Sequence, residues 1–405
     1  MIRPVAVVFL VVTALFAATP ALAVPTIIPD SGDTGWLLAS LCIGMLAGIS
    51  GILAIAIGGH GRTATAQILT AASAAIALAT LLFFLGGYSL AFDIEGSAWI
   101  GGYNNMMLNN MGTLREGTTV PETGFVLFHL GFVLIAVALL AALLAPRARP
   151  GWLLAFSGLW LMLVLVPIMR WVWGGWLGAM GALDSAGGLV VFYATAVSAF
   201  VAMVLIGRKK DAQAPTPDHG LRLIGALLLL VGMAAMAGGS TLGASDSSAV
   251  AMLAMVTASM TGALTSAALQ RRLDASALAT GLIAGTVVSA AVGDGISIGA
   301  AWLIGVIAAI AVHLAPRAMP KRLAWQDADG SAMTIAAAAK TGGFLLAIFL
   351  ASAPFGGSDY GEGMTMTSQL IAQFAAILAI AGWSVFGTLV AALMAGLVLP
   401  MRAED

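Results

Sequence analysis

The sequence predicts an all-α polytopic membrane protein in which eleven transmembrane helices follow a signal peptide. Three observations support this fold class. First, 60% of the 405 residues are hydrophobic and only 9% are charged, whereas soluble domains contain about 25% charged residues. Second, eleven apolar runs are long enough to cross a hydrocarbon core of about 30 Å. Third, most basic residues fall on alternate loops between these runs, as expected of membrane proteins.

The first 23 residues have the features of a signal peptide. Arg3 is followed by an apolar stretch that is broken by Pro20 and ends in the small-residue motif Ala21-Leu22-Ala23. A basic residue, an apolar segment and a cleavage-type motif in this order are typical of secretory signals. An uncleaved additional helix is the alternative. We predict that residues 1–23 are a signal peptide and residues 24–405 a transmembrane domain.

The predicted spans follow one another along the mature chain. Each contains roughly 17 or more residues, the length needed to cross the bilayer at a rise of about 1.5 Å per residue. Their ranges are 33–57, 66–91, 123–145, 151–170, 186–207, 221–238, 248–269, 276–292, 296–314, 334–352 and 367–397.

The basic residues predict the orientation. With the mature N-terminus outside and the C-terminus inside, the inner loops and tail hold 13 of the 17 basic residues. An even number of spans would spoil this alternation. We therefore predict an N-out, C-in protein of a bacterial-type cytoplasmic (inner) membrane. The inner residues are Arg62, Arg147, Arg149, Arg208, Lys209, Lys210, Arg222, Arg271, Arg272, Arg317, Lys321, Arg322 and Arg402.

The inner loop at 207–222 divides the chain near its middle. It contains prolines and charged residues and reads as a solvated linker. It separates halves of about 33–207 and 221–352, with a last helix at about 367–397. Because the first half has an odd number of spans, a repeated unit in the second half would have inverted topology, as in many transporters.

Several function classes are excluded by the residues that the chain lacks. Cys42 is the single cysteine, and the histidines at 60, 129, 219 and 313 are too scattered for a metal site. No set of nucleophile and base is apparent, and the net charge of −1 gives no reason to expect nucleic acid as a partner. We expect neither an enzyme nor a bound metal or cofactor.

The segment MRWVWGGWLGAMGALDSAGG at 169–188 resembles the signature of the ammonium transporter (Amt/Rh) family. The likeness extends to GGYSLAF at 86–92, to the apolar segment at 33–59 and to FHLGFVLIAVALLAALLAPR at 128–147. Span count, orientation and signal peptide agree with it. The resemblance implies a pseudo-two-fold inverted repeat of five plus five helices with a final helix, and an ammonium or ammonia transporter or channel.

The resemblance also implies an outer cation-recruitment site. Trp173, Phe128 and Ser240 match the family's positions, and an aromatic face over a desolvated cation contributes on the order of 1 to 2 kcal/mol. Phe132 and Met236 match the two gate positions below. From the residues alone, membrane-interface anchoring and i, i+4 packing explain such aromatics equally well.

Asp184 matches the carboxylate that braces the family's outer vestibule. A carboxylate at the outer end of a span is costly unless it is paired or accepts hydrogen bonds from the free N–H groups of a following helix. Capping combined with close packing at Gly187 and Gly188 is also a sufficient explanation for the motif.

The central pore departs from the family pattern. The family carries two pore histidines, and the first position, eight residues after Asp184, is Phe192. The second falls on Ala336 or Thr334, depending on the anchor used for counting, so the histidine pair is absent. Lys340 lies one turn after Ala336, and we expect it to face the pore, although snorkelling is the alternative.

Two further departures concern His129 and the C-terminal tail. His129 stands where the family usually has glutamine, and it either senses or relays protons or is a satisfied hydrogen-bonding residue. Only five residues follow residue 400, which makes a PII-type regulator doubtful. We expect a homotrimer surrounded by lipid. The alternative functions are a non-conducting ammonium sensor or binding protein of the same fold, and a channel for another small solute.

Overall fold

The computed structural model describes residues 29–207, 216–324, 326–327, 329–351 and 359–402. Within these ranges the chain is helical, and its isolated β-bridges form no named strand. Eleven helical segments in this part of the chain are long and apolar enough to span a membrane, which confirms the predicted number. They are Ser31–His60, Arg62–Phe92, Glu122–Leu144, Pro150–Ala179, Gly188–Ile206, His219–Gly239, Asp246–Gln270, Ala275–Val292, Ile298–Ala318, Ser331–Phe349 and Met366–Val398.

Several spans are built from two α-helices joined by a π-helical segment. The first span consists of α2 (Ser31–Ile43) and α3 (Ser50–His60), and the second contains α4 (Thr65–Leu82) and α5 (Tyr88–Phe92). Single π-helical turns occur within α-helices, and often at functional sites. A π-helical segment also joins α7 (Pro150–Trp160) to α8 (Val166–Trp173), and another precedes α10 (Ala194–Ile206), whereas α9 (Trp176–Ala179) follows α8 after two glycines.

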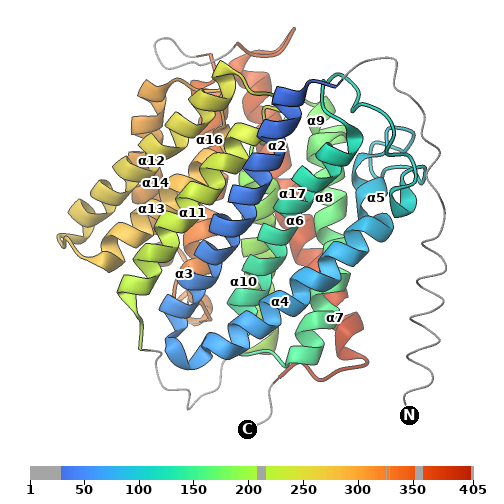
Figure 1. Cartoon of the computed structure of the whole chain (residues 1–405). Coiled ribbons are helices and arrows are strands. Elements are labelled where there is room, and N and C mark those ends of the chain that lie inside the picture. Colours follow the sequence, from blue (N-terminus) through green and yellow to red (C-terminus); the bar gives the residue numbers. More distant parts are fainter. Residues whose placement is uncertain (1–28, 208–215, 325, 328, 352–358, 403–405) are drawn as a thin grey trace.

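The other helices are uninterrupted. They are α6 (Glu122–Leu144), α11 (His219–Gly239), α12 (Asp246–Gln270), α13 (Ala275–Val292), α14 (Ile298–Ala318), the short α15 (Lys321–Ala324), α16 (Ser331–Phe349) and α17 (Met366–Gly396). In Figure 1 these helices run roughly from the top to the bottom of the molecule, so that loops gather at its two ends.

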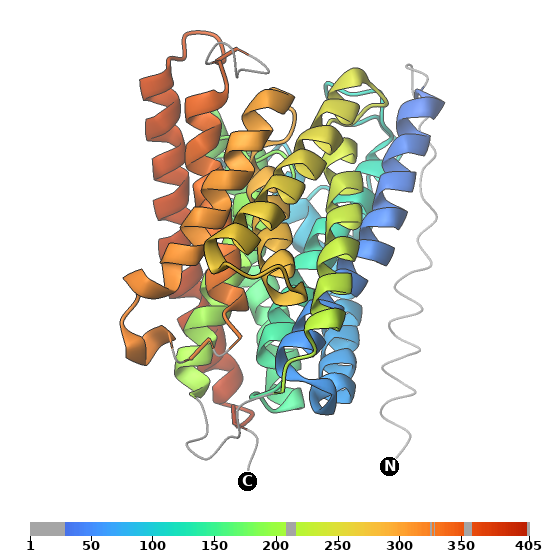
Figure 2. The same ribbon diagram turned by 90° about the vertical axis from the view of Figure 1, so that its left-hand side faces the viewer.

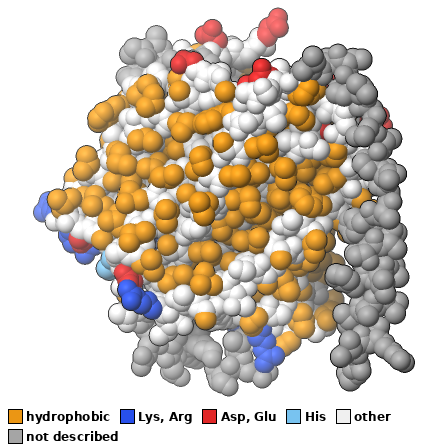
Figure 3. All heavy atoms as spheres, viewed as in Figure 1, with side chains coloured by type: hydrophobic (Ala, Val, Ile, Leu, Met, Phe, Trp, Pro, Cys, Tyr) orange, Lys and Arg blue, Asp and Glu red, His pale blue; other side chains and the backbone are white. Residues whose placement is uncertain are grey.

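Helix α6 forms the middle of the bundle. All but two of its 23 residues are buried, and it contacts α2, α3, α4 and α10. A helix that is apolar on every side is stable only when it is buried. The outer helices instead expose large hydrophobic side chains, and orange apolar atoms cover most of the face shown in Figure 3. Such a surface is suited to a lipid environment.

The two halves of the chain meet along α3 and α11. A Cβ at Gly225 would lie 2.7 Å from the carbonyl oxygen of Gly51, and a Cβ at Gly51 would lie equally close to that of Gly225. Only residues without a side chain permit the two backbones to come so close, as in other membrane helix pairs. In Figure 2, α2 (dark blue) and α17 (red) lie at opposite edges of the bundle, and α17 packs on α7, α10 and α16.

Charged groups gather at the two ends of the bundle. In Figure 3 carboxylates lie at the end where α2 begins, and lysine and arginine side chains lie at the opposite end. The predicted signal peptide and the basic residues at 208–210 fall outside the described residues. The inverted repeat and the N-out, C-in orientation stay predictions.

Candidate functional site

An aromatic cluster lies where α8 ends and α6 begins. The ring centroid of Trp173, the last residue of α8, is 5.3 Å from that of Phe132 and 5.7 Å from that of His129. Phe128 meets Phe132 edge to face at 5.3 Å. Both phenylalanines are 1% exposed and lie one turn apart on α6. The structure thus brings together three aromatic residues from the resemblance and places His129 among them.

The indole of Trp173 is fixed by the segment that follows α9. Its Nε1–H donates to the backbone carbonyl of Asp184 at 2.8 Å. Because this N–H group is already used, the ring face is the part of the side chain that is available to a cation. The ring is partly exposed, so the residue is positioned by the protein while one side remains accessible.

Ser240 reaches the same region from the end of α11. Its hydroxyl donates to the carbonyl of Ala237 at 2.8 Å and lies 3.4 Å from the hydroxyl of Ser185. A Cβ at the neighbouring Gly239 would come within 2.5 Å of the Phe128 ring. Glycine at this position therefore allows the end of α11 to approach Phe128 closely. Since its own hydrogen is donated, the Ser240 oxygen keeps lone pairs for a further donor.

The Asp184 carboxylate organises the start of the fifth span. One oxygen accepts hydrogen bonds from the backbone N–H groups of Leu189 at 3.0 Å and Val190 at 2.7 Å, whereas the other oxygen is buried without a partner. Burial raises the pKa of Asp184 to about 7, and the backbone donors oppose this shift. The carboxylate accordingly stabilises the helix start and does not contact the aromatic rings.

His129 is enclosed by rings. Its Nδ1 lies 2.9 Å from the carbonyl oxygen of Phe125, and because a carbonyl only accepts, Nδ1 carries the hydrogen in this bond. The ring centroids of Phe125 and Phe92 lie 3.9 and 4.5 Å away. Of the two alternatives for His129, the hydrogen-bonding role is thus present in the structure, and a proton-active role remains untested.

A buried ionic group lies beside this cluster and was not anticipated from the sequence. Arg115 pairs with Glu122 at 3.3 Å, and the Tyr88 hydroxyl donates to the same carboxylate. The guanidinium carbon of Arg115 lies 4.4 Å from the centroid of Phe125, the ring that packs on His129. No local signal in the sequence pairs these distant residues, since a loop of irregular structure carries Arg115 to the start of α6.

The two gate positions lie at adjacent levels. Phe132 and Met236 are both buried. A Cβ at Gly131, the residue before Phe132, would lie 3.1 Å from the terminal methyl group of Met236. Met236 therefore packs against the backbone of α6 beside Phe132, where a flexible thioether fills the space next to the ring.

A second carboxylate repeats the arrangement of Asp184. Asp327 accepts hydrogen bonds from the N–H groups of Ala332 and Met333 at 3.4 and 2.7 Å, five and six residues further on, as Leu189 and Val190 are from Asp184. Counting eight residues from each aspartate leads to Phe192 and Ile335. Asp327 was not predicted from the sequence, although its spacing from the start of the tenth span resembles that of Asp184 from the start of the fifth.

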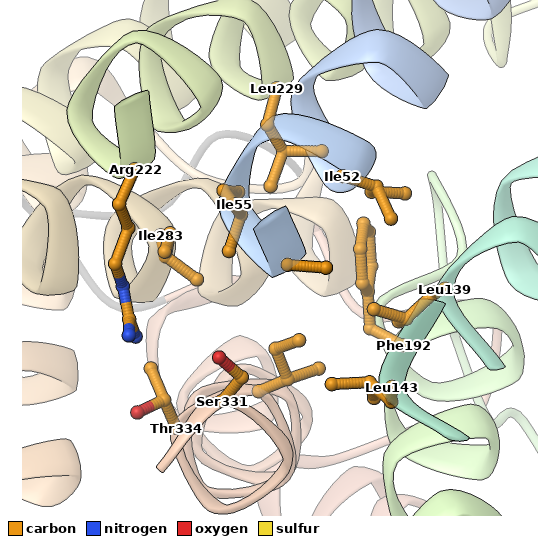
Figure 4. A pocket seen from close by; sticks show the side chains of 12 residues that line it. Ile52, Ile55, Leu139, Leu143, Phe192, Arg222, Leu229, Ile283, Ser331 and Thr334 are labelled. Carbon is orange, nitrogen blue, oxygen red and sulfur yellow. The ribbon is translucent and has the colours of Figure 1, made fainter. Parts of the chain in front are cut away.

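A small cavity lies between the two halves, and Phe192 and Ile335 both line it (Figure 4). Of the two positions predicted for the second histidine, Thr334 also lines the cavity and Ala336 does not. The lining is mostly aliphatic. It consists of Ile52, Ile55, Ala56, Leu139, Leu143, Phe192, Arg222, Leu229, Ile283, Ser331, Thr334 and Ile335.

Lys340 does not face this cavity. Its side chain is exposed on the outer face of α16, whereas Ile335 is 4% exposed on the inner face. The expectation of a pore-facing lysine is therefore wrong. This expectation assumed that Ala336 lies on the inner face of α16. Lys340, one turn later, would then lie on the same face. In the structure Ala336 is itself partly exposed, and Lys340, four residues later, lies on the same outer face.

The cavity instead contains a different cation, Arg222, at the start of α11. In the described part of the chain, no group of three or more histidine, cysteine or acidic side chains could hold a metal ion. The arrangement is thus an aromatic cluster at one end, a buried gate and an apolar cavity, with no set of groups suited to covalent catalysis.

Comparisons with known proteins identify the family. A family model described as Ammonium Transporter Family matches residues 35–405. The chain is 30% identical to a putative ammonium transporter of Methanothermobacter thermautotrophicus over 74% of this chain and 75% of that protein. It matches the crystal structure of Candida albicans Mep2 with a TM-score of 0.81 and 25% identity, covering 93% of this chain and 87% of the other.

A Sensor Amt Protein has the same fold, with a TM-score of 0.81 at 21% identity over 92% of this chain and 95% of the other. The family model spans almost all of the described residues, including the aromatic cluster and the cavity. The relatives are transporters and not enzymes. This chain therefore belongs to the Ammonium Transporter Family.

Proposed function

We propose that the protein moves ammonium or ammonia across a membrane, with Trp173, Phe128 and Ser240 as its outer recruitment site. The observation that carries the proposal is the hydrogen bond of Trp173 to the carbonyl of Asp184 at 2.8 Å. It uses the indole N–H and leaves the ring face for a cation.

The chemistry of the cluster suits a small cation with N–H donors. The rings of Trp173 and Phe128 offer negative faces, and the Ser240 oxygen, whose hydrogen is donated to Ala237, offers an acceptor. Two aromatic faces and one hydrogen bond hold ammonium weakly, which permits release into the pathway. Phe132 and Met236 lie next along α6 and α11, and we assign them the role of the gate.

We further propose that the protein is a homotrimer in a cytoplasmic membrane, with its N-terminus outside and residues 24–405 forming the membrane domain. The orientation is supported by the basic residues at the end of the bundle opposite the start of α2. We propose no PII-type regulator. A proton-active role of His129 would be exerted by a ring whose Nδ1–H already donates to the carbonyl of Phe125.

Uptake of ammonium into proteoliposomes tests the function. An ammonium gradient is applied, and entry is followed with an internal pH dye and, in parallel, as charge movement. We expect saturable entry in the wild type and none in empty vesicles. Ser240→Ala removes the acceptor, and it should raise the half-saturating ammonium concentration roughly 10- to 160-fold, as expected for the loss of one hydrogen bond of about 1.5 to 3 kcal/mol to a charged group.

A non-conducting sensor is the second candidate. It is favoured by the apolar cavity in which Phe192 and Ile335 occupy the matching positions, since neither side chain exchanges protons. Ammonium binding to purified protein, measured by calorimetry, together with no entry by either readout would support the sensor and overturn the transporter. Entry of another small solute, tested with methylammonium and urea, would support the third alternative.

A further inference from the structure

Arg222 brings a positive charge into the central cavity. It lies at the inner end of α11, is 8% exposed, and points towards Ser331 and Thr334 in Figure 4. Its Nη1–H donates to the backbone carbonyl of Asp329 at 3.2 Å, whereas its Nε–H is buried with no partner. An arginine stays protonated in proteins, so this group is a fixed cation.

The nearest counter-charge of Arg222 belongs to the carboxylate of Asp329. The Asp329 carboxylate accepts a hydrogen bond from the Ser331 hydroxyl at 2.5 Å. A Cβ at Gly59, at the end of α3, would lie 2.6 Å from one of its oxygens. Asp329 does not line the cavity, and Arg222 does. The pair therefore presents its positive end to the cavity.

A second, larger cavity shares one lining residue with the first. Thr334 lines both, and the second cavity lies between the inner ends of α12, α13, α14 and α16. Its polar lining includes Gln270, His313 and Arg317. Among the described residues that line the two cavities there is no carboxylate, so their fixed charges, Arg222 and Arg317, are both positive.

We infer that Arg222 is a charge filter that closes the inner half of the pathway to ammonium ion and leaves it open to the neutral molecule. The outer cluster presents aromatic faces that attract a positively charged solute. The inner half presents apolar side chains and the positively charged guanidinium of Arg222, which repels such a solute. A positive solute would have to approach the guanidinium within a partly buried space, where like charges interact much more strongly than in water.

This inference rests on the proposed function, because it concerns the form in which the solute leaves. The test uses the full chain in proteoliposomes and records ammonium-driven current and neutral entry separately. Arg222→Gln removes the charge, Arg222→Lys keeps it, and Arg62→Gln is the matched control. The Arg62 side chain is 83% exposed and pairs with Asp218 at 2.9 Å at the same end of the bundle.

The expected result is a current near background in the wild type, in Arg222→Lys and in Arg62→Gln, and a current at least about tenfold larger in Arg222→Gln. Thr334→Asp is an independent variant that keeps Arg222 and adds a carboxylate to the same cavity. It should also admit current, which keeps the test valid if Arg222→Gln does not fold.

Equal currents in the wild type and the folded charge-removing variants would overturn the filter. If the wild type shows neither current nor neutral entry, the proposed transport is refuted, and the variants still decide the inference. A current gained by Arg222→Gln or Thr334→Asp then shows that the charge closed the pathway, and silence in both shows that it did not.

Discussion

Replacing Trp173 separates its two contributions, the ring face and the indole N–H. Trp173→Leu removes both, whereas Trp173→Phe removes only the N–H and keeps a smaller aromatic face. The hydrogen bond to the Asp184 carbonyl, 2.8 Å long, is lost in both variants and should cost each about 1 kcal/mol of stability. The loss of the face is specific to the leucine variant and amounts to about 1 to 2 kcal/mol of cation binding.

This difference converts to a roughly 5- to 30-fold higher half-saturating ammonium concentration for Trp173→Leu than for Trp173→Phe. Initial uptake rates over a range of ammonium concentrations measure it, and thermal unfolding in detergent measures the shared stability loss. Trp171→Phe is the matched control. Trp171 lies two residues earlier, and its Nε1–H donates to the Trp99 carbonyl at 3.0 Å, outside the cluster. Identical half-saturation in the leucine and phenylalanine variants would refute the recruitment role.

Three further predictions concern the frame of the site. Burial raises the pKa of Asp184 to about 7 from an ordinary 3.8. The folded state therefore binds the extra proton between these pH values, and stability falls by up to about 4 kcal/mol as pH rises through them. Asp184→Asn should flatten the pH dependence of the unfolding temperature, and an unchanged profile would contradict the assignment. Lys340→Ala should leave uptake unchanged because that side chain lies on the outer face of α16, and a large loss of uptake would restore a pore role. Gly225→Val should abolish a monodisperse elution peak because its side chain would meet the Gly51 carbonyl. Gly220→Ala should elute like the wild type, because its Cβ would lie 3.5 Å from an Asp218 oxygen, an ordinary van der Waals contact.

The number of spans could be predicted because apolar length is a local property of the chain. The predicted ends of the spans were less accurate where glycine or proline suggests that a helix stops before it does. The fourth span was predicted at 151–170 but extends to Ala179, because the glycine-containing segment after Trp173 re-enters a helix at Trp176. The ninth was predicted to end at 314, before Pro316, but α14 continues to Ala318. A proline so close to the end of a helix removes only one hydrogen bond there.

The residues of the outer cluster could be predicted from the resemblance to the ammonium transporter family, but not from their spacing in the sequence. Phe128 and Phe132 share a helix face, which spacing alone indicates, but their contact with Trp173 depends on tertiary packing. Ser240 comes from the other half of the chain, and the residue before it, Gly239, approaches Phe128 so closely that a Cβ there would lie 2.5 Å from the ring. Such a contact has no signal in local sequence.

The inner half was predicted poorly because its register depends on one carboxylate. The two positions predicted for the second pore histidine, Thr334 and Ala336, lie one residue to either side of Ile335. Asp327 is the residue that accepts the N–H groups at the start of α16, and it sets the register. An error of one residue rotates a helix face by about 100°, which is enough to bring an outward lysine into an expected pore.

The aliphatic part of the central cavity has a consequence for the energetics of the cell. Side chains such as Ile52, Leu139 and Phe192 offer no hydrogen bond to water, and apolar cavities of this kind stay dry. Protons move rapidly along chains of hydrogen-bonded water, and such a chain is interrupted here. If the proposed transport takes this route, the solute therefore enters without protons moving along water beside it, and the proton gradient that drives ATP synthesis is not dissipated.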